Sequence, residues 1–439
     1  MTITISGIEQ VGSEAKTAPF SLPENIIRYA LVLGIMLTPF MMWRFHPAIQ
    51  FTFSDGCFLI AAVFALASGR LNLNPLGDLW PWWLISFCLM LFALGASSLV
   101  NGDPLRFAIT GSQYAFAYLA LPYFLFSGTE GIEIRLAKFF VIAVVAMEAI
   151  SIILFYLYGD VTGSLGWINH NFVSGARRLG SFLGSANRNA ALICLTLPFI
   201  FYFAKTRLLP LWFCIGGTAI LALALTLTAS VTGFVSSIAA VLIFVGASYG
   251  WHAWKPLSAV LGVLLLAVVG GMPIPDTFQD RVLSAFTDGD IEEAGTYGGR
   301  MGLVEEALKF SDDTHILGIG ADQFRSLSDE GAPVHNITLL IWTEGGMFAL
   351  LGWAFVMGLL ALIAFRAIKY DKTVAALALS VVLCFFIISN ASTHVYARIW
   401  VVPVLIAARF AVVAAQKKHR RAEVFGRINL KTLPKAVPR

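Results

Sequence analysis

The sequence predicts an all-α polytopic membrane protein with about 12 transmembrane helices. Of its 439 residues, 58% are hydrophobic and only 13% are charged, whereas soluble domains average about 45–50% apolar and 25% charged residues. The apolar residues form continuous runs of roughly 17–25 residues, the length at which a helix spans a bilayer. These runs exclude a porin-like barrel, whose strands alternate in hydrophobicity over about ten residues.

The predicted spans follow one another through most of the chain. They lie at 26–43, 50–68, 79–100, 106–126, 137–158, 189–204, 208–228, 231–250, 256–272, 346–366, 374–390 and 396–415. Two longer polar segments, 159–188 and 273–335, interrupt them. We therefore expect an N-terminal cytoplasmic tail, N-terminal transmembrane helices, a central catalytic region containing the periplasmic loop 273–335, C-terminal transmembrane helices and a basic cytoplasmic tail. The bounds of these five parts are 1–25, 26–158, 159–366, 367–415 and 416–439.

The cysteines and the N-terminus add two expectations. All five cysteines lie inside apolar runs, a pattern that indicates neither a disulfide framework nor a metal site. Residues 1–25 are polar and lack the apolar core of a cleavable signal peptide. We therefore expect the first apolar run to act as an uncleaved membrane anchor.

Basic residues in the connectors predict the orientation, because cytoplasmic loops are enriched in Lys and Arg. With the N-terminus in the cytoplasm, the inner connectors carry Arg70, Arg135, Lys138, Lys205, Arg207, Lys255, Arg366, Lys369 and Lys372. The tail 416–439 holds eight basic residues and one acid, Glu423. An even number of spans places this tail in the cytoplasm as well.

The outer connectors nevertheless carry many cations, and almost all of them are arginine. They are Arg44, Arg106, Arg177, Arg178, Arg188, Arg281, Arg300, Lys309, Arg325 and Arg398. A guanidinium stays charged at any relevant pH and binds phosphate through two parallel hydrogen bonds. Arginine on the disfavoured side therefore indicates phosphate binding, and anchoring to lipid headgroups with ordinary ion pairs is the alternative.

The first outer segment, 159–188, is rich in Gly, Ser and Asn and carries Arg177, Arg178 and Arg188. Asn187 is a suitable N-cap for the span that follows. A helix N-terminus beside an arginine favours anion binding. We expect these residues to contribute to a substrate site.

The second outer segment, 273–335, combines loops with short helices. Residues 273–299 have a loop-like composition with an acidic patch at 288–293. The apolar spacing of 300–311 predicts an amphipathic helix on or near the membrane surface. A Gly-rich turn follows, and then a short helix at about 320–329.

Several motifs occur here in a fixed order. They are Arg300 opening the amphipathic helix, Leu-Gly-Ile-Gly at 317–320, His335-Asn336, and Glu344-Gly345-Gly346 entering the next span. Upstream, Arg-Leu-Gly-Ser-Phe at 178–182 precedes Asn187. This combination resembles the O-antigen ligase and Wzy-type polymerase family of bacterial envelope proteins. The resemblance covers about 160–366 in motif and the whole chain in architecture.

The resemblance implies a GT-C-like glycosyltransferase of the bacterial inner membrane that works on the periplasmic face without a metal ion or other cofactor. The donor is an oligosaccharide on undecaprenyl pyrophosphate. The acceptor is a sugar hydroxyl on another lipid-linked repeat, for a polymerase of exopolysaccharide or O-antigen, or on lipid A-core, for a ligase. The lipid bilayer, a flippase and a chain-length regulator are the other expected partners, and no nucleic acid is expected.

The resemblance also assigns roles to residues. Arg300 matches the family's essential arginine and stabilises the leaving pyrophosphate electrostatically. His335 matches the family histidine and serves as the base that activates the acceptor hydroxyl. Arg178, Arg188, Arg177, Asn187, Asn336 and Glu344 are expected at the substrate. From the residues alone, an interfacial histidine capping the next helix fits His335 equally well, and Glu344 also fits an ordinary interfacial carboxylate.

One stretch departs from the family pattern. Many members carry Ser-Arg-(Ser/Thr/Gly)-Gly at the outer end of a mid-chain span, but this chain reads Ala-Ser-Val-Thr-Gly at 229–233, with Val231 in the arginine's place. One phosphate contact is therefore missing or moved. Arg188, Arg177 or Arg178 could compensate.

Two other classes of protein compete with this interpretation. Twelve spans with both ends inside also fit a transporter or flippase of lipid-linked sugars, for which Asp55 and Glu148 are the main intramembrane acids. We see no six-plus-six repeat in the chain. The third class is a non-catalytic scaffold of an envelope assembly complex. The sequence does not decide between a polymerase and a ligase, and it slightly favours a polymerase.

Overall fold

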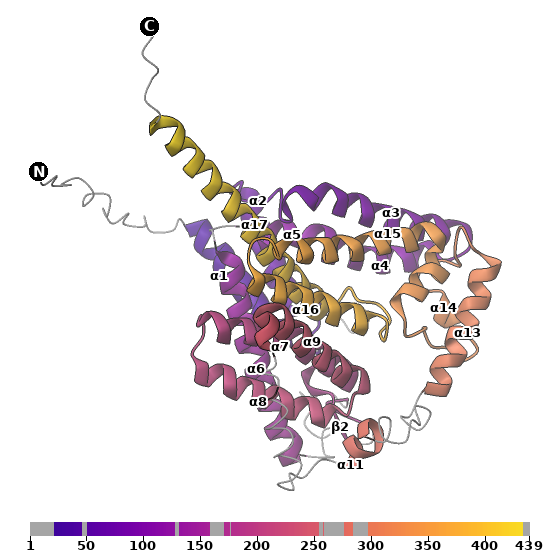
Figure 1. Cartoon of the computed structure of the whole chain (residues 1–439). Helices are drawn as coiled ribbons and strands as arrows, with labels where there is room; N and C mark the ends of the chain where they lie inside the picture. The colour runs from indigo at the N-terminus through magenta and orange to yellow at the C-terminus, as the bar shows by residue number, and fades with distance from the viewer. Residues whose placement is uncertain are drawn as a thin grey trace, which may run out of the picture.

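A computed structural model describes residues 22–45, 51–127, 131–158, 171–175, 177–253, 258, 276–283 and 297–432. At a few helical positions, Arg300 among them, it describes the backbone alone. Long helices dominate this part of the chain (Figure 1). Eight of the described helices are long and apolar enough to cross a membrane. The predicted class, an all-α polytopic membrane protein, is therefore confirmed.

The first two helices form a short antiparallel pair. α1 (Leu22–Leu37) and α2 (Phe53–Ala67) have 16 and 15 residues, fewer than the roughly 20 that span a bilayer upright. α2 begins at a capping box in which Thr52 and Asp55 satisfy each other's backbone N–H groups. Ser54 joins the two helices by donating from Oγ to the Gly34 carbonyl at 2.9 Å.

The next spans show how proline and cap residues set helix bounds. The 3₁₀ turn η1 (Gly77–Leu79) leads into α3 (Trp80–Val100), and Asp103 caps α4 (Pro104–Tyr114). The predicted span 106–126 is divided between α4, the π-helical η2 (Ala115–Ala120) and α5 (Leu121–Leu125). Pro122 lies at the start of α5, directly after the π-helical η2, so its missing N–H coincides with a break in the regular α-helical hydrogen bonds.

Four further spans surround a small irregular segment. They are α6 (Ile132–Tyr158), α7 (Ala186–Thr206), α8 (Leu211–Thr228) and α9 (Val231–Tyr249), followed by η5 (Gly250–Ala253). Between α6 and α7, β1 (Val173–Ser174) pairs antiparallel with β2 (Arg178–Leu179), and η4 (Ser181–Leu183) follows. The predicted outer segment 159–188 therefore contains a two-stranded hairpin in its described part.

The second polar segment and the C-terminal spans complete the fold. In the described part they comprise α11 (Asp276–Phe278), η6 (Gln279–Leu283), α13 (Tyr297–Asp313), α14 (Phe324–Leu327), α15 (Ile337–Ala367), α16 (Lys372–Ser389) and α17 (Arg398–Thr432). The helix predicted at 300–311 is thus α13, longer than expected. The one predicted at 320–329 is wrong in extent, because α14 has only four residues and the backbone at Gly320 and Asp322 has positive φ.

α13 packs against α15 through one face. Leu303 and Ala307 are buried, while Met301 and Leu308 are exposed. Ser311 Oγ and Thr343 Oγ1 lie 3.0 Å apart, and Thr343 also donates to the Ala307 carbonyl. The amphipathic pattern therefore reflects packing on a membrane helix.

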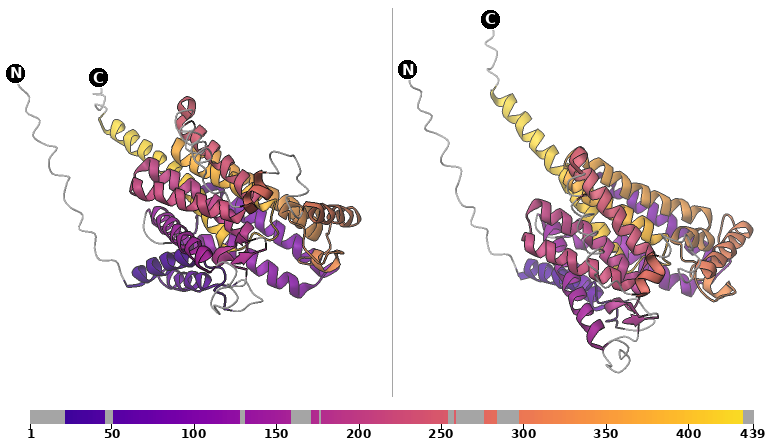
Figure 2. Two further views of the ribbon diagram at one scale, coloured as in Figure 1. Left: turned by 90° about the horizontal axis from the view of Figure 1, so that it is seen from below. Right: turned by 60° about the horizontal axis from the view of Figure 1, so that its bottom comes forward.

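The bundle has two distinguishable ends. We call the end where α3 finishes and α15 begins the outer end, and the opposite one the inner end. α3 and α15 run side by side, α13 and α14 lie at the outer end, and the far part of α17 leaves the bundle at the inner end (Figures 1 and 2). The predicted total of twelve spans and the GT-C-like fold remain predictions, and most of the span 256–272 and the acidic patch 288–293 lie outside the described residues.

Candidate functional site

A kink in α15 organises the outer end. Gly346 has φ 73° and ψ −171° within this helix, a backbone conformation that glycine tolerates without steric cost. The break exposes backbone groups of α15 that an unbroken helix would pair internally. The turn after α13 uses them: Ile319 N donates to Thr343 O at 2.9 Å, Gly320 N to Glu344 O at 2.8 Å, and Met347 N to His315 O at 3.0 Å.

Two glycines of this turn allow its close approach. Gly318 lies against the backbone of Glu344 and Gly345 with no room for a Cβ. Gly320, at φ +102°, lies equally close to Gly102 after α3. Asn101 Nδ2 then donates to the Gly318 carbonyl at 2.9 Å. Backbone-to-backbone contact thus fixes the turn between α3 and α15.

The fixed turn presents Asp322 and Arg325. Arg325 Nη2 donates to the Asp322 carboxylate at 2.9 Å, and Arg106 Nη1 donates to the Asp322 backbone oxygen at 2.8 Å. Burial raises the pKa of the Asp322 carboxyl, but His394, Arg325 and Arg106 lower it by more, so its pKa lies below the ordinary aspartate value. Asp322 is therefore ionised at neutral pH.

Four arginines meet in a cavity beside this turn. Its volume is about 500 Å³, and Arg44, Arg106, Arg188 and Arg325 line it together with Asp322, His394, Tyr396 and Pro333. The arginines come from four separate parts of the chain: the α1–α2 connector, the start of α4, the start of α7 and α14. With one carboxylate against four guanidinium groups, the cavity is suited to an anion carrying more than one charge.

His394 and Tyr396 also line the cavity. Their rings stack with centroids 5.4 Å apart. His394 Nδ1 lies 3.4 Å from the Tyr114 hydroxyl, and Nε2 lies 3.7 Å from Asp322 Oδ1. Burial and the nearby Asp322 raise the pKa of Tyr396. The hydroxyl of Tyr396 therefore stays protonated near neutral pH.

The connector bearing these two rings is held firmly in place. Tyr118 donates to the Val395 carbonyl at 2.7 Å. Arg398 donates to the Tyr396 carbonyl at 2.7 Å and forms a buried ion pair with Asp55. Neither His394 nor Asp322 was predicted as a site residue from the sequence. The one available signal was His394, Tyr396 and Arg398 at alternate positions on the outer side.

A family model matches part of the chain. Residues 216–354 match the family model described as O-antigen ligase. Over this region the chain is O-antigen ligase-like. The resemblance predicted from the sequence is thereby confirmed over this region, and it implies an enzyme of glycosyl-transfer type whose substrates are lipid-linked glycans in general. No curated protein matches the chain.

The O-antigen ligase-like region contains the 317–320 turn, His335 and the kink of α15. His335 is half-buried and lies two residues after Pro333 of the cavity wall. Asn336 is the N-cap of α15, and its Oδ1 accepts from Leu339 N at 3.0 Å. Glu344 is buried and accepts from Phe324 N at 3.3 Å. Glu344 thus holds the turn that carries Arg325.

The Arg178 side chain extends from β2 to the α8–α9 junction. At this junction the O-antigen ligase-like pattern has an arginine, and this chain has Val231. Arg178 Nε donates to Thr228 O and Nη2 to Asn187 Oδ1, both at 2.8 Å. The same Asn187 oxygen accepts from Ser230 Oγ at 3.3 Å. A guanidinium therefore reaches the end of α8, three residues before Val231, although residue 231 does not supply it.

Asn187 is not the N-cap of α7, so that prediction is wrong. Ser185 holds this position, because the Asn187 side chain is engaged by Arg178 and Ser230 instead. The next residue, Arg188, lines the four-arginine cavity. Asn187, which contacts Arg178, and Arg188, which lines the cavity, are thus neighbours in α7.

The remaining predicted residues lie apart from this cavity or lack a described side chain. Arg177 is exposed, with its guanidinium 5.8 Å from the centre of the Phe155 ring. Arg300 lies in the first turn of α13, where only the backbone is described. Glu148 is buried in α6, and Asn189 Nδ2 donates to it at 3.3 Å.

Proposed function

We propose that the protein transfers a glycan from undecaprenyl pyrophosphate to a sugar hydroxyl on the periplasmic face of the inner membrane. The observation that carries the proposal is the convergence of Arg44, Arg106, Arg188 and Arg325 on one cavity at the outer end. Arginines that only anchored lipid headgroups would be spread around the membrane boundary. Convergence of four guanidinium groups instead supports binding of a compact polyanion.

The proposed reaction places the pyrophosphate in this cavity. The acceptor hydroxyl attacks the anomeric carbon and gives its proton to a base. The bond between that carbon and the phosphate oxygen breaks, and its electron pair stays on the pyrophosphate. Guanidinium groups directed at the departing oxygen stabilise the charge that develops there. A volume of about 500 Å³ is within the usual range of small-molecule sites, about 300–1,000 Å³.

Two histidines lie near enough to the cavity to be considered as the base. We retain His335, the residue that the family resemblance selects, and place it next to the cavity through Pro333. His394 lines the cavity directly, and its Nε2 lies 3.7 Å from Asp322 Oδ1. We therefore assign His394 to holding the pyrophosphate. Arg300 remains a proposed donor to the leaving group, and Arg178 replaces the arginine absent at 231.

The transporter alternative receives less support. Of its two candidate intramembrane acids, Asp55 is buried in an ion pair with Arg398, and Glu148 accepts a hydrogen bond from Asn189. Buried charges are expected to be paired in this way for structural reasons alone. The ion pair accounts for Asp55 without ion coupling, whereas Glu148 Oε1 is buried without a hydrogen-bond partner among the described residues.

The deciding experiment reconstitutes the purified protein with a lipid-linked oligosaccharide donor and a glycan acceptor. We expect longer or newly joined glycan and release of undecaprenyl pyrophosphate. Movement of donor across the vesicle bilayer without glycan transfer would instead identify a flippase. A gene deletion separates the remaining alternatives: loss of all capped lipid A-core indicates a ligase, whereas single-repeat capping or loss of secreted polymer indicates a polymerase.

A further inference from the structure

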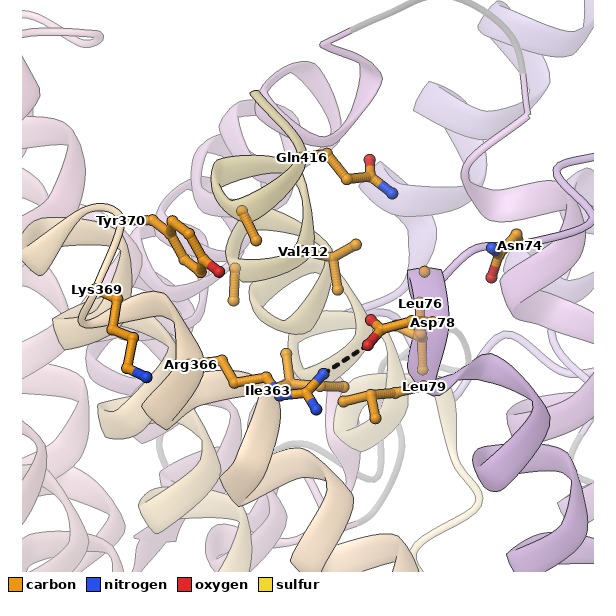
Figure 3. A pocket seen from close by; sticks show the side chains of 13 residues that line it. Asn74, Leu76, Asp78, Leu79, Ile363, Arg366, Lys369, Tyr370, Val412 and Gln416 are labelled. Atoms are coloured by element: carbon orange, nitrogen blue, oxygen red, sulfur yellow. Dashed lines mark hydrogen bonds and ion pairs between the residues drawn. The ribbon is translucent and has the colours of Figure 1, made fainter. Parts of the chain in front are cut away.

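A second large cavity opens at the inner end of the bundle (Figure 3). Its volume is about 790 Å³. The segment after α2, the last turns of α15 and the stretch of α17 that leaves the bundle build its walls. The part of α15 between its kink at Gly346 and its end at Ala367 is roughly 30 Å long at 1.5 Å per residue, and it separates this cavity from the four-arginine cavity. The two cavities therefore lie at opposite membrane surfaces.

The inner cavity combines an apolar wall with a polar rim. Leu76, Leu79, Ile363 and Val412 supply apolar surface. Arg366, Lys369 and Tyr370 stand on one side of α17, and Asn74 and Asp78 on the other, as Figure 3 shows. An apolar wall next to cations and amide groups at a membrane boundary matches an amphiphile, with its phosphate at the rim and its glycerol backbone against the wall.

The charges of the rim favour an anion. Arg366 Nη1 donates to Asp78 Oδ2 at 2.8 Å, and this is the ion pair drawn in Figure 3. Both side chains are substantially exposed, at 46% and 79%, so water weakens their attraction. The pair engages one of the five N–H donors of Arg366, which leaves guanidinium donors for a phosphate. Lys369 makes the net charge of the rim positive.

We propose that this inner cavity binds the phosphate headgroup of an anionic phospholipid of the facing leaflet. The cavity opens where the predicted cytoplasmic connectors and basic tail gather, the side on which anionic lipids attract basic residues. The bound headgroup would bridge α15 to the segment after α2 across α17. This proposal goes beyond the proposed function and does not depend on it, because no atom of the inner cavity takes part in glycan transfer.

The test uses the full chain, purified in detergent and stripped of lipid. Phosphatidylglycerol, phosphatidylcholine and glycerol phosphate are titrated separately, and bound molecules are counted by native mass spectrometry. We expect one phosphatidylglycerol to bind at least tenfold more tightly than phosphatidylcholine, with glycerol phosphate unable to displace it. The doubly substituted R366Q/K369Q variant should lose this preference, while R135Q, which removes a predicted inner-face cation outside the cavity, should keep it.

Asp78→Asn separates lipid binding from a purely structural ion pair. Removing this acid frees Arg366 and lowers repulsion of the phosphate, so affinity for phosphatidylglycerol should rise severalfold. Lys369→Gln alone, which leaves the ion pair intact, should lower it, and this variant replaces the double one if that fails to fold. Equal binding of both lipids, an equal loss in R135Q, or displacement of the lipid by glycerol phosphate would each overturn the proposal.

Discussion

Gly318 lies against the backbone of Glu344, without space between them for a single added carbon. The two residues belong to motifs 26 positions apart in the sequence, and their contact fixes the turn that presents Asp322 and Arg325 to the four-arginine cavity. The order of these motifs predicted a common site. The contact explains the physical need for glycine there, because the turn replaces hydrogen bonds that the kinked helix lacks.

Gly318→Ala should destabilise the protein by about 1–3 kcal/mol, the usual result of inserting a methyl group into a filled space. Thermal unfolding in detergent measures this change. Gly358→Ala is the control, because a Cβ at Gly358, within α15, meets nothing within 4 Å. Equal unfolding temperatures for the two variants would contradict the packing described for Gly318.

Arg188→Lys should reduce the rate of glycan transfer about 10²–10³-fold, the effect of removing one preorganised donor to a developing oxyanion. Lysine keeps the charge but cannot form two parallel hydrogen bonds with a phosphate. The rate is measured in reconstituted vesicles at saturating acceptor. Lys309→Ala, which removes an exposed cation of α13, should retain full activity, and a comparable loss there would indicate a diffuse charge effect.

Arg178→Ala should weaken donor binding, and adding Val231→Arg to that variant should restore it at least in part. The reason is that Arg178 lies at the α8–α9 junction, where an arginine at residue 231 would otherwise supply the guanidinium. Donor affinity is measured by titration with a lipid-linked oligosaccharide. If the double variant binds no better than Arg178→Ala alone, Arg178 is not the substitute.

Asp322→Asn should lower stability by about 1–3 kcal/mol at neutral pH, since it removes the charge-assisted hydrogen bond from Arg325. The folded-state pKa of Asp322 lies below its unfolded value. Its contribution is therefore complete above the ordinary aspartate pKa of about 3.9 and disappears as the pH falls through the lower folded pKa. Unfolding curves of both proteins should converge in that acidic range, and a constant difference would refute the ionic contribution.

His335→Ala should lower kcat by about 10²–10⁴-fold, as expected for loss of a general base, with a smaller change in KM. His394→Ala should mainly raise KM for the donor. The pH profile of kcat/KM distinguishes the two, because loss of the base removes one of its inflections. If instead His394→Ala lowered kcat and His335→Ala mainly raised KM for the donor, His394 would be the base.

The sequence predicted those features that depend on neighbouring residues. Apolar runs placed the long spans, and the spacing of Leu303 and Ala307 predicted α13. Features that depend on distant contacts were missed or wrong. Asn187 has an N-cap composition, but Arg178 and Ser230 engage its side chain, so Ser185 takes the cap position. His394 and Asp322 are 72 residues apart, and no local pattern relates them.

Asp322 also bears on turnover. Four guanidinium groups with no opposing charge would hold a spent pyrophosphate carrier tightly, and its departure would then limit the rate. Asp322 competes for Arg325 through its carboxylate and for Arg106 through its backbone oxygen. Asp322 can thus pair with both Arg325 and Arg106 as soon as the carrier leaves. Asp322 is the one acid among the described residues that line the cavity. It therefore lowers the barrier to release of the carrier, and so allows the next chain to enter.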